Sequence, residues 1–574
     1  MQPCKIGVYV CQCGTNIAKV VDCEDVVAFA ATLPHVVLSK TYKYMCSNPG
    51  QDMIVQDIQS HGLDRVVVAA CSPRMHERTF RNALQVAGLN PYFFEMANIR
   101  EHCSWVHEDH VAATEKAKAL VRGAVFRVAR HEALERKTVD MCPEVLVLGG
   151  GVSGLTAALD IAEAGYRVRL VERQGALGGN LARIDLTAPY LNAARDLLTE
   201  RITRVTENER IDVLLHSRLV NLEGFIGNYR ATVETRDADN PPRKTEFLVG
   251  NVIVATGYQE FDAGRITHYG YGKLPNVVTS FEFEQMLRQG RVQMDDGRLP
   301  RFVSIVHCVG SRSQEFHGYC SRVCCMTALK YAHEVRSAIP GCRVSDIYID
   351  MHAFGKGHED FYRRSSEVKT LFLMYRKGDR PVIRKAQPSD GCDMLIEVNE
   401  QLSGETIEIP SDLVVLMVGM EARSDAHEVA RLVNISQDKE GWFIESHPKL
   451  DPVATTTDGI YIAGTCAAPK DIPDTVAQAR ASAARILAKV ARGKIEVDAV
   501  YAEVDEARCS GCRICNDLCP YSAIEFDLEK KVSRVISAVC KACGACGSAC
   551  PSGAIKARHF TDAQIFAQIE GVLR

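Results

Sequence analysis

The sequence predicts an α/β protein made of three consecutive domains. A small parallel α/β domain is expected over residues 1–140, a larger nucleotide-binding core over 141–497, and a cysteine-rich α+β domain over 498–574. Three observations support this division. Short β-branched runs alternate with helix-length intervals at the N-terminus, a strand leads into a glycine-rich turn near residue 149, and a cysteine motif occurs twice near the C-terminus.

Composition limits the class of protein. The 574 residues carry a net charge of −4 and include no long basic block, so the sequence predicts no basic surface of the kind that binds nucleic acid. No apolar run reaches the roughly 18 residues of a membrane span, so we expect no transmembrane segment. The first residues lack a signal-peptide pattern. Together with 23 cysteines, this predicts reduced thiols and a cytoplasmic protein.

The N-terminal domain is expected to bring four cysteines to one edge of a sheet. Apolar runs at 5–10, 36–39 and 65–70 are typical of buried parallel strands. The cysteines that end these strands or follow them are Cys11, Cys13, Cys46 and Cys71. Because the carboxyl ends of parallel strands form the ligand-binding edge, these thiols can surround an iron–sulfur cluster. They can equally be ordinary buried cysteines, and the sequence leaves both interpretations open.

A dinucleotide-binding unit begins at residue 144. The strand over 144–148 leads into G-x-G-x-x-G, whose glycines are Gly149, Gly151 and Gly154, and a helix follows. The first glycine permits the tight turn, the second lets backbone approach a pyrophosphate, and the third lets helix and strand pack closely. The helix N-terminus attracts negative charge. A second strand ends at Glu172, which predicts an acceptor for a ribose hydroxyl.

Later segments favour FAD as the dinucleotide. One apolar strand ends in Ala255-Thr-Gly257, and another stops at Gly464. This set resembles the two-dinucleotide flavoproteins, such as thioredoxin reductase, in which these segments surround FAD. The resemblance implies FAD contacts at Gly149, Gly151, Val152, Ser153, Gly154, Glu172, Arg173, Gly179, Asn180, Ala255, Thr256, Gly257, Gly464 and Thr465. That family usually has an acid after the last Ala-Gly, whereas Thr465 and Cys466 stand here, so this contact must be made differently.

The second nucleotide unit of that family is altered in this chain. The strand over 301–307 is followed by one glycine, Gly310, in place of three, so we expect no pyridine nucleotide site. The same stretch contains C-x11-C-x3-C-C, and these four thiols can hold a [4Fe–4S] cluster. The candidate ligands are Cys308, Cys320, Cys324 and Cys325. Buried or reactive cysteines and a redox-active pair are the alternatives, although adjacent cysteines lack the CxxC geometry of such a pair.

The C-terminal domain contains C-x2-C-x2-C-x3-C-P twice. Each run supplies three ligands to one [4Fe–4S] cluster and its fourth cysteine to the neighbouring cluster. Zinc ribbons are the alternative, but their CxxC pairs are usually separated by longer loops. The expected ligand sets are Cys509, Cys512, Cys515 and Cys550 for one cluster, and Cys540, Cys543, Cys546 and Cys519 for the other. Residues 561–573 predict a helix whose apolar side either packs on its own domain or docks a partner.

Five short motifs resemble the A-type subunits of heterodisulfide reductase and their relatives. They are Cys71-Ser-Pro-Arg74, Cys308-Val-Gly-Ser-Arg312, Cys320-Ser-Arg-Val-Cys-Cys-Met-Thr-Ala-Leu-Lys330, Ala353-Phe-Gly-Lys-Gly357 and Pro469-Lys-Asp-Ile-Pro473. The resemblance implies an oxidoreductase component that passes electrons between FAD and [4Fe–4S] clusters. It places Lys330 beside the flavin ring, where a cation stabilises the reduced, anionic flavin. It also implies a homodimer within a larger complex, whose partners are heterodisulfide reductase B- and C-like subunits, hydrogenase or formate dehydrogenase subunits, or ferredoxin.

One departure from that family concerns an inserted ferredoxin module. Methanogen-type members carry it within the flavin domain, but this chain has no cysteine between Cys142 and Cys308 and is therefore a shorter form. Some members divide an electron pair between two acceptors, the process called flavin-based electron bifurcation. The sequence leaves bifurcation, the electron donor and the terminal acceptor open. An autonomous NAD(P)H-dependent flavin oxidoreductase is the alternative function, and the single glycine at Gly310 argues against it.

Overall fold

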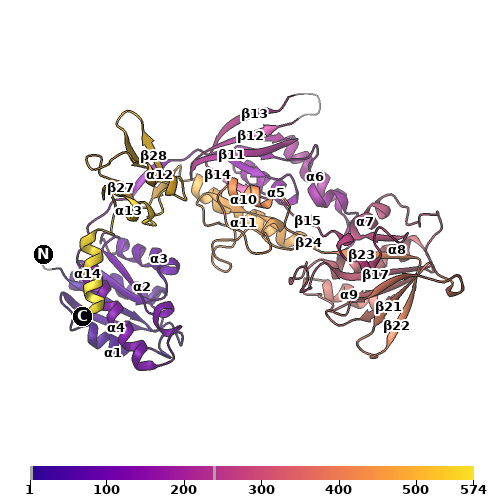
Figure 1. Cartoon of the computed structure of the whole chain (residues 1–574), viewed down its shortest axis with the longest axis horizontal. Helices are drawn as coiled ribbons and strands as arrows, with labels where there is room; N and C mark the ends of the chain where they lie inside the picture. The colour runs from indigo at the N-terminus through magenta and orange to yellow at the C-terminus, as the bar shows by residue number, and fades with distance from the viewer. Residues whose placement is uncertain (1–3, 237–240) are drawn as a thin grey trace. The chain divides into compact units, whose positions relative to one another are not determined.

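The computed structural model describes residues 4–236 and 241–574, and the chain divides into two compact units (Figure 1). The first unit combines residues up to 138 with residues 496–574, and the second contains residues 139–495. The two ends of the chain therefore fold together, although more than half of the sequence separates them. The boundaries at 140 and 497 remain a prediction for independently folding domains.

The first unit contains a four-stranded parallel sheet in the order β2-β1-β3-β4. Its strands are β1 (Ile6–Cys11), β2 (Val36–Tyr42), β3 (Arg65–Ala70) and β4 (Phe94–Asn98), and its helices are α1 (Cys23–Ala30), α2 (Asn48–His61), α3 (Pro73–Val86) and α4 (His110–Val128). Because side chains of a strand alternate between its faces, Val8 packs with α1 and α4, whereas Tyr9 packs with α2 and α3. The loops that follow the strands meet at one edge of the sheet.

The C-terminal part of the first unit is a small α+β module followed by a helix. It contains β27 (Ala502–Val504), α12 (Ile514–Leu518), β28 (Ile524–Asp527), β29 (Val532–Val535), α13 (Ala545–Ala549), β30 (Ile555–Ala557) and α14 (Asp562–Leu573). Helix α14 packs along α4, as Figure 1 shows. A Cβ atom added at Gly571 would lie 2.8 Å from the Cα atom of Gly123, so the helices approach closely because both residues lack side chains.

The apolar side of α14 does not make this contact. The buried residues of the helix include Gln564, Ala567 and Gly571, whereas its exposed apolar residues are Ile565, Phe566, Ile569 and Leu573. The helix therefore packs within its own unit through small side chains. Of the apolar residues that suggested an amphipathic helix, only Val572 lies at this interface, where it faces Gly123.

The second unit is built on two sheets with parallel strands. The first has the order β10-β7-β6-β14-β25. Its strands are β6 (Val145–Leu148), β7 (Val168–Val171), β10 (Ile211–Leu214), β14 (Asn251–Val254) and β25 (Ile460–Ile462). Taken in chain order this is 3-2-1-4-5, the arrangement of a dinucleotide-binding fold. Helices α5 (Val152–Glu163), α6 (Ala194–Thr206) and α11 (Ile472–Val490) pack on one face, and the antiparallel strands β11 (Ser217–Phe225), β12 (Asn228–Thr235) and β13 (Arg243–Val249) pack on the other.

The second sheet of this unit has the order β16-β23-β17-β18-β19. Its strands are β16 (Val277–Thr279), β17 (Phe302–Val309), β18 (Arg343–Tyr348), β19 (Leu371–Met374) and β23 (Leu413–Val418), and its helices are α7 (Ser280–Arg288), α8 (Cys324–Ala338) and α9 (His358–Glu367). An antiparallel sheet of β20 (Val382–Lys385), β21 (Met394–Asn399) and β22 (Thr406–Ser411) packs beside it. Two parallel sheets of this kind in one unit confirm the predicted α/β fold with a two-dinucleotide core.

Helices α4 and α11 are the longest among the described residues, with 19 residues each. Within the described ranges, no helix combines the length and the apolar character needed to cross a bilayer.

Candidate functional site

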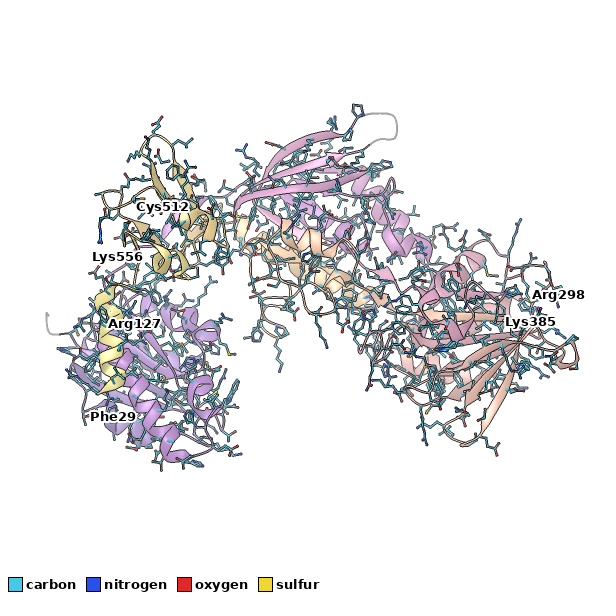
Figure 2. The ribbon with its side chains drawn as sticks, in the orientation of Figure 1. Phe29, Arg127, Arg298, Lys385, Cys512 and Lys556 are labelled. Carbon is cyan, nitrogen blue, oxygen red and sulfur yellow. The ribbon has the colours of Figure 1, made fainter. Side chains whose placement is uncertain are left out.

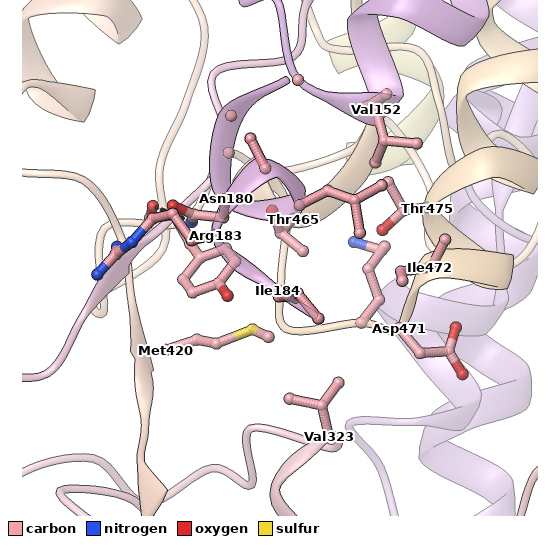
Figure 3. Close-up of a pocket in the computed structure, with 18 of the residues that line it drawn as sticks. Val152, Asn180, Arg183, Ile184, Val323, Met420, Thr465, Asp471, Ile472 and Thr475 are labelled. Carbon is pink, nitrogen blue, oxygen red and sulfur yellow. Dashed lines mark hydrogen bonds between the residues drawn. The ribbon is translucent and has the colours of Figure 1, made fainter. Parts of the chain in front are cut away.

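A cavity of about 1220 Å³ opens in the second unit between its two parallel sheets. Its wall includes the glycine turn after β6, the ends of β7 and β14, and the N-terminus of α11. In Figure 3, Val152, Ile472 and Thr475 line one side, and Met420 and Val323 face them from the other half of the unit. Ligand cavities for drug-sized molecules usually measure about 300–1,000 Å³, so this cavity is large enough for a dinucleotide.

The glycine turn fits the approach of a pyrophosphate. A Cβ atom at Gly149 would lie 2.3 Å from the carbonyl oxygen of Ala255, and one at Gly154 would lie 1.9 Å from the carbonyl oxygen of Gly149. Both glycines are therefore required by packing. A Cβ atom at Gly151 would meet nothing closer than Gly179, at 4.0 Å. Since Gly151 lines the cavity at the N-terminus of α5, its bare backbone faces free space that a phosphate can occupy.

Most predicted FAD-binding residues line this cavity. The lining includes Gly149, Gly151, Val152, Ser153, Glu172, Arg173, Gly179, Asn180, Ala255, Thr256, Gly257 and Thr465, while Gly154 and Gly464 support it from behind. Glu172 accepts hydrogen bonds from the backbone N–H groups of Gly150 (2.6 Å) and Gln174 (2.7 Å). Its carboxylate thereby holds the glycine turn against the end of β7.

Near Gly464, where the related flavoproteins usually have an acid, this chain has the positive charge of Lys470 and of the N-terminus of α11. Lys470 lines the cavity, and its Nζ donates to the carbonyl oxygens of Gly464 (2.8 Å) and Ala468 (2.9 Å). Burial lowers the pKa of Lys470. Asp471 caps α11, so the positive end of that helix also borders the cavity. The motif over 469–473 was the sequence signal for this wall, although its spacing alone does not connect it with the flavin.

Lys330 lies in the cavity wall and is 1% exposed. Its Nζ forms an ion pair with Glu284 and donates to the carbonyl oxygen of Leu186 at 3.1 Å. The hydroxyl of Tyr331 donates to the same carboxylate at 3.0 Å. A buried cation thus lies at the cavity, together with a carboxylate that sequence reasoning missed, and its place beside the flavin ring stays a prediction.

The four cysteines of the C-x11-C-x3-C-C motif gather at the end of β17 and the start of α8. Burial, followed by the proximity of Cys325 and Cys320, raises the pKa of Cys308 to about 12. Burial, with Cys308, Cys325 and Cys320 nearby, raises the pKa of Cys324 well above its usual value. Crowded, buried thiols ionise more readily beside positive charge, which the iron of a bound cluster would supply. Cys324 also lines the cavity, so the thiol group and the cavity share a wall.

A buried ion pair lies beneath these cysteines. His307 of β17 pairs with Asp346 of β18, and both are 0% exposed. Burial would lower the pKa of His307, but Asp346 raises it to about 10. Burial likewise works to raise the pKa of Cys325, but the neighbouring His307 brings it below its usual value. Cys325 is therefore the most readily ionised thiol of this group.

The four N-terminal cysteines also converge. Burial raises the pKa of Cys71 to about 12, and its neighbours include Arg100, Cys13 and Cys11. Burial raises the pKa of Cys46 as well, with Cys13 beside it. The guanidinium of Arg100 donates to Cys13 Sγ at 3.6 Å. The sheet edge therefore brings Cys11, Cys13, Cys46 and Cys71 together, and Arg100, which sequence reasoning missed, supplies positive charge beside them.

The C-terminal module brings the four cysteines of one expected set together, and the second set stays a prediction. A small cavity of about 20 Å³ is lined by Cys519, Cys540, Cys543 and Cys546. Burial, followed by Cys540, Cys519 and Cys543, raises the pKa of Cys546 to about 11. The backbone N–H groups of Ala502 and Ala523 donate to sulfur atoms of this set. Of the other set, Cys515 is buried, and Cys509 and Cys550 are half-buried. Cys512 is exposed and is labelled in Figure 2.

Single-ion sites are not found among the residues that the structure describes, where no three Cys, His, Asp or Glu side chains lie at the spacing of one metal ion. A [4Fe–4S] cluster binds its cysteines through separate iron atoms and therefore holds them farther apart.

Comparisons with known proteins decide the family. A family model described as FAD dependent oxidoreductase matches residues 144–228, and one described as 4Fe-4S dicluster domain matches residues 501–551. An A-type iron–sulfur subunit of the CoB--CoM heterodisulfide reductase of Methanopyrus kandleri is 40% identical over 99% of both chains. The corresponding A-type subunit of Methanocaldococcus jannaschii is 39% identical over 99% of this chain and 98% of that protein. The chain belongs to the family of heterodisulfide reductase A-type subunits.

It follows that this protein is an oxidoreductase component that carries FAD and [4Fe–4S] clusters and transfers electrons. The A-type subunit of the H(2):CoB-CoM heterodisulfide,ferredoxin reductase of Methanothermobacter marburgensis is 38% identical over 100% of this chain and 98% of that protein. That alignment spans 654 positions, more than the 574 residues here, so the relative has residues without a counterpart in this shorter form.

Among solved structures, the thioredoxin reductases of T. acidophilum and Lactococcus lactis are similar to this chain. The first has a TM-score of 0.40 at 15% identity, and the second has a TM-score of 0.42 at 17% identity. Each comparison covers 61% of this chain and 100% of the reductase.

Proposed function

We propose that electrons pass between FAD in the large cavity and a [4Fe–4S] cluster held by Cys308, Cys320, Cys324 and Cys325. The observation that carries this proposal is the position of Cys324, which belongs to the four-thiol group and also lines the cavity. Bound FAD exchanges two electrons with a donor, and each cluster takes one, so their contact converts between the two modes. The chain contributes the pyrophosphate cradle at Gly151 and the cation Lys330.

The first unit provides the remaining clusters in this proposal. The crossed sets of the C-terminal module hold two, with Cys509, Cys512, Cys515 and Cys550 on one and Cys519, Cys540, Cys543 and Cys546 on the other. The convergence of the four N-terminal cysteines, with Arg100 beside them, supports a fourth cluster. Because the N-terminal sheet and the C-terminal module form one compact unit, these three clusters lie on the same body.

Substrate reduction is assigned to partner proteins. The names of relatives mention H(2), formate, CoB-CoM heterodisulfide and ferredoxin. On that likeness we place the chain, as a homodimer, in a cytoplasmic complex with B- and C-like subunits and a hydrogenase or formate dehydrogenase. Division of an electron pair at the flavin is the finer form of this proposal, because those relatives are named for two acceptors.

The test is the cofactor content of anaerobically purified protein. We expect one FAD and about sixteen iron atoms per chain, four for each of four cubanes, and about twelve in Cys324→Ala with FAD retained. Unchanged iron content in this variant would contradict the ligand assignment. NADH and NADPH are expected to leave the flavin absorbance unchanged, and fast bleaching would instead support the autonomous oxidoreductase.

A further inference from the structure

Two buried carboxylates, those of Glu284 and Glu334, form a cluster with the ammonium group of Lys330. Glu284 of α7 forms an ion pair with Lys330 Nζ, and Glu334 of α8 lies 3.6 Å from it. Asp185 belongs to the segment before the short strand β8 (Leu186–Thr187), and its backbone N–H donates to Glu284 at 2.9 Å. The cluster is buried, with Glu284 2% exposed. One buried cation beside two buried carboxylates leaves a net negative charge when both are ionised, and this favours protonation of one of them.

Glu334 is the member of the cluster best placed to hold that proton. Glu284 already accepts hydrogen bonds from Tyr331 and from the backbone of Asp185. In contrast, Oε2 of Glu334 is buried without a hydrogen-bond partner among the described residues. Its nearest charged partner is Lys330 Nζ at 3.6 Å, and an ionised oxygen that accepts no hydrogen bond is more costly to bury than one that accepts several. Burial, opposed by Lys330 and reinforced by Glu284 and Asp185, raises the pKa of Glu334 to about 7.

We propose that Glu334 takes up a proton when the flavin is reduced and transmits its charge to the cavity through Lys330. Lys330 lines the cavity, whereas Glu334 lies behind it on the next turn of α8, so Glu334 acts as a positioning residue. This inference rests on the proposed function, because it requires FAD in that cavity and electrons from its donor.

Electrons and protons balance in this step. A flavin bound in the cavity would carry a negative charge on its ring after it has received two electrons and one proton. That charge attracts Lys330 and weakens the ion pair between Lys330 and Glu334. The Glu334 carboxylate then binds one further proton from solvent. A second proton is therefore taken up at any pH at which Glu334 is ionised in the oxidised protein and protonated in the reduced protein. This pH range begins near pH 7 and extends upward.

The experiment is a spectroelectrochemical titration of the flavin in the holoprotein between about pH 5.5 and 9, which brackets the pKa of Glu334. For a two-electron couple, each extra proton adds about 30 mV per pH unit to the fall of the midpoint potential. The wild-type protein is expected to show this additional slope above pH 7. Glu334→Gln should lose it with FAD still bound, and Glu334→Asp, which keeps an acid, should retain a break in the profile.

The matched control is Glu367→Gln, since Glu367 is an exposed carboxylate at the end of α9. Its profile should superimpose on that of the wild type. A FAD-replete Glu334→Gln protein whose profile matches the wild type would overturn this inference and leave the proposed function standing. A wild-type chain that binds no FAD would overturn both.

Discussion

Substitutions in the glycine turn separate two roles that the structure gives to neighbouring glycines. A Cβ atom at Gly151 has ample room, because its nearest neighbour is the Cα atom of Gly179 at 4.0 Å. Gly151→Ala should therefore leave the stability of the apoprotein within about 0.5 kcal/mol of wild type. A Cβ atom at Gly154 would lie 1.9 Å from a carbonyl oxygen, so Gly154→Ala should destabilise the same apoprotein by about 1–3 kcal/mol.

The effect on FAD should be the reverse. The added methyl group at Gly151 stands where a phosphate must approach the N-terminus of α5, and a lost hydrogen bond to a charged group costs about 1.5–3 kcal/mol. This corresponds to a rise of roughly 10- to 150-fold in the dissociation constant of FAD.

The assays are flavin fluorescence during titration of the apoprotein with FAD, and thermal unfolding of the apoprotein. Gly151→Ala with the affinity of wild type would refute the placement of the pyrophosphate. Equal destabilisation of the apoprotein by Gly151→Ala and Gly154→Ala would refute the assignment of phosphate binding to Gly151 and of packing to Gly154.

Three further predictions concern buried groups. Lys330→Ala should lower the flavin midpoint potential with FAD and iron retained, because the buried cation is lost, and an unchanged redox titration would count against its role. Burial, opposed by Arg127, raises the pKa of Glu95 to about 7, so the first unit should lose stability as pH rises from about 4.5 to 7. Glu95→Gln should make the thermal stability independent of pH over that range, and a pH dependence equal to that of the wild type would contradict this role of Glu95. Gly571→Leu should release α14 from α4 and expose it to limited proteolysis, and wild-type resistance would contradict the close helix contact.

Local sequence patterns predicted the parts of the fold that local physics determines. Strands β1, β2 and β3 were expected because each is a short, β-branched apolar run. Strand β4 was not expected, since the five residues Phe94–Asn98 include Glu95 and Asn98 and carry little strand pattern. The repeated motif likewise indicated that Cys519 lies with Cys540, Cys543 and Cys546, because the spacing itself encodes this geometry.

The groups that tune the site depend on tertiary contacts and could not be read from spacing. Glu284 lies 46 residues from Lys330 and reaches it only because α7 and α8 lie on the same sheet. Arg100 approaches Cys13 across 87 residues. The two ends of the chain, which form one unit, approach closely at Gly123 and Gly571, neither of which belongs to a motif.

The central claim is that the flavin and the cluster held by Cys324 are in contact. The most direct measurement is electron paramagnetic resonance of the half-reduced holoprotein, in which a nearby paramagnetic cluster accelerates the relaxation of the flavin radical. We predict accelerated relaxation in the wild type and slow relaxation in FAD-replete Cys324→Ala. Slow relaxation in the wild type, with all clusters present and reduced, would contradict the account.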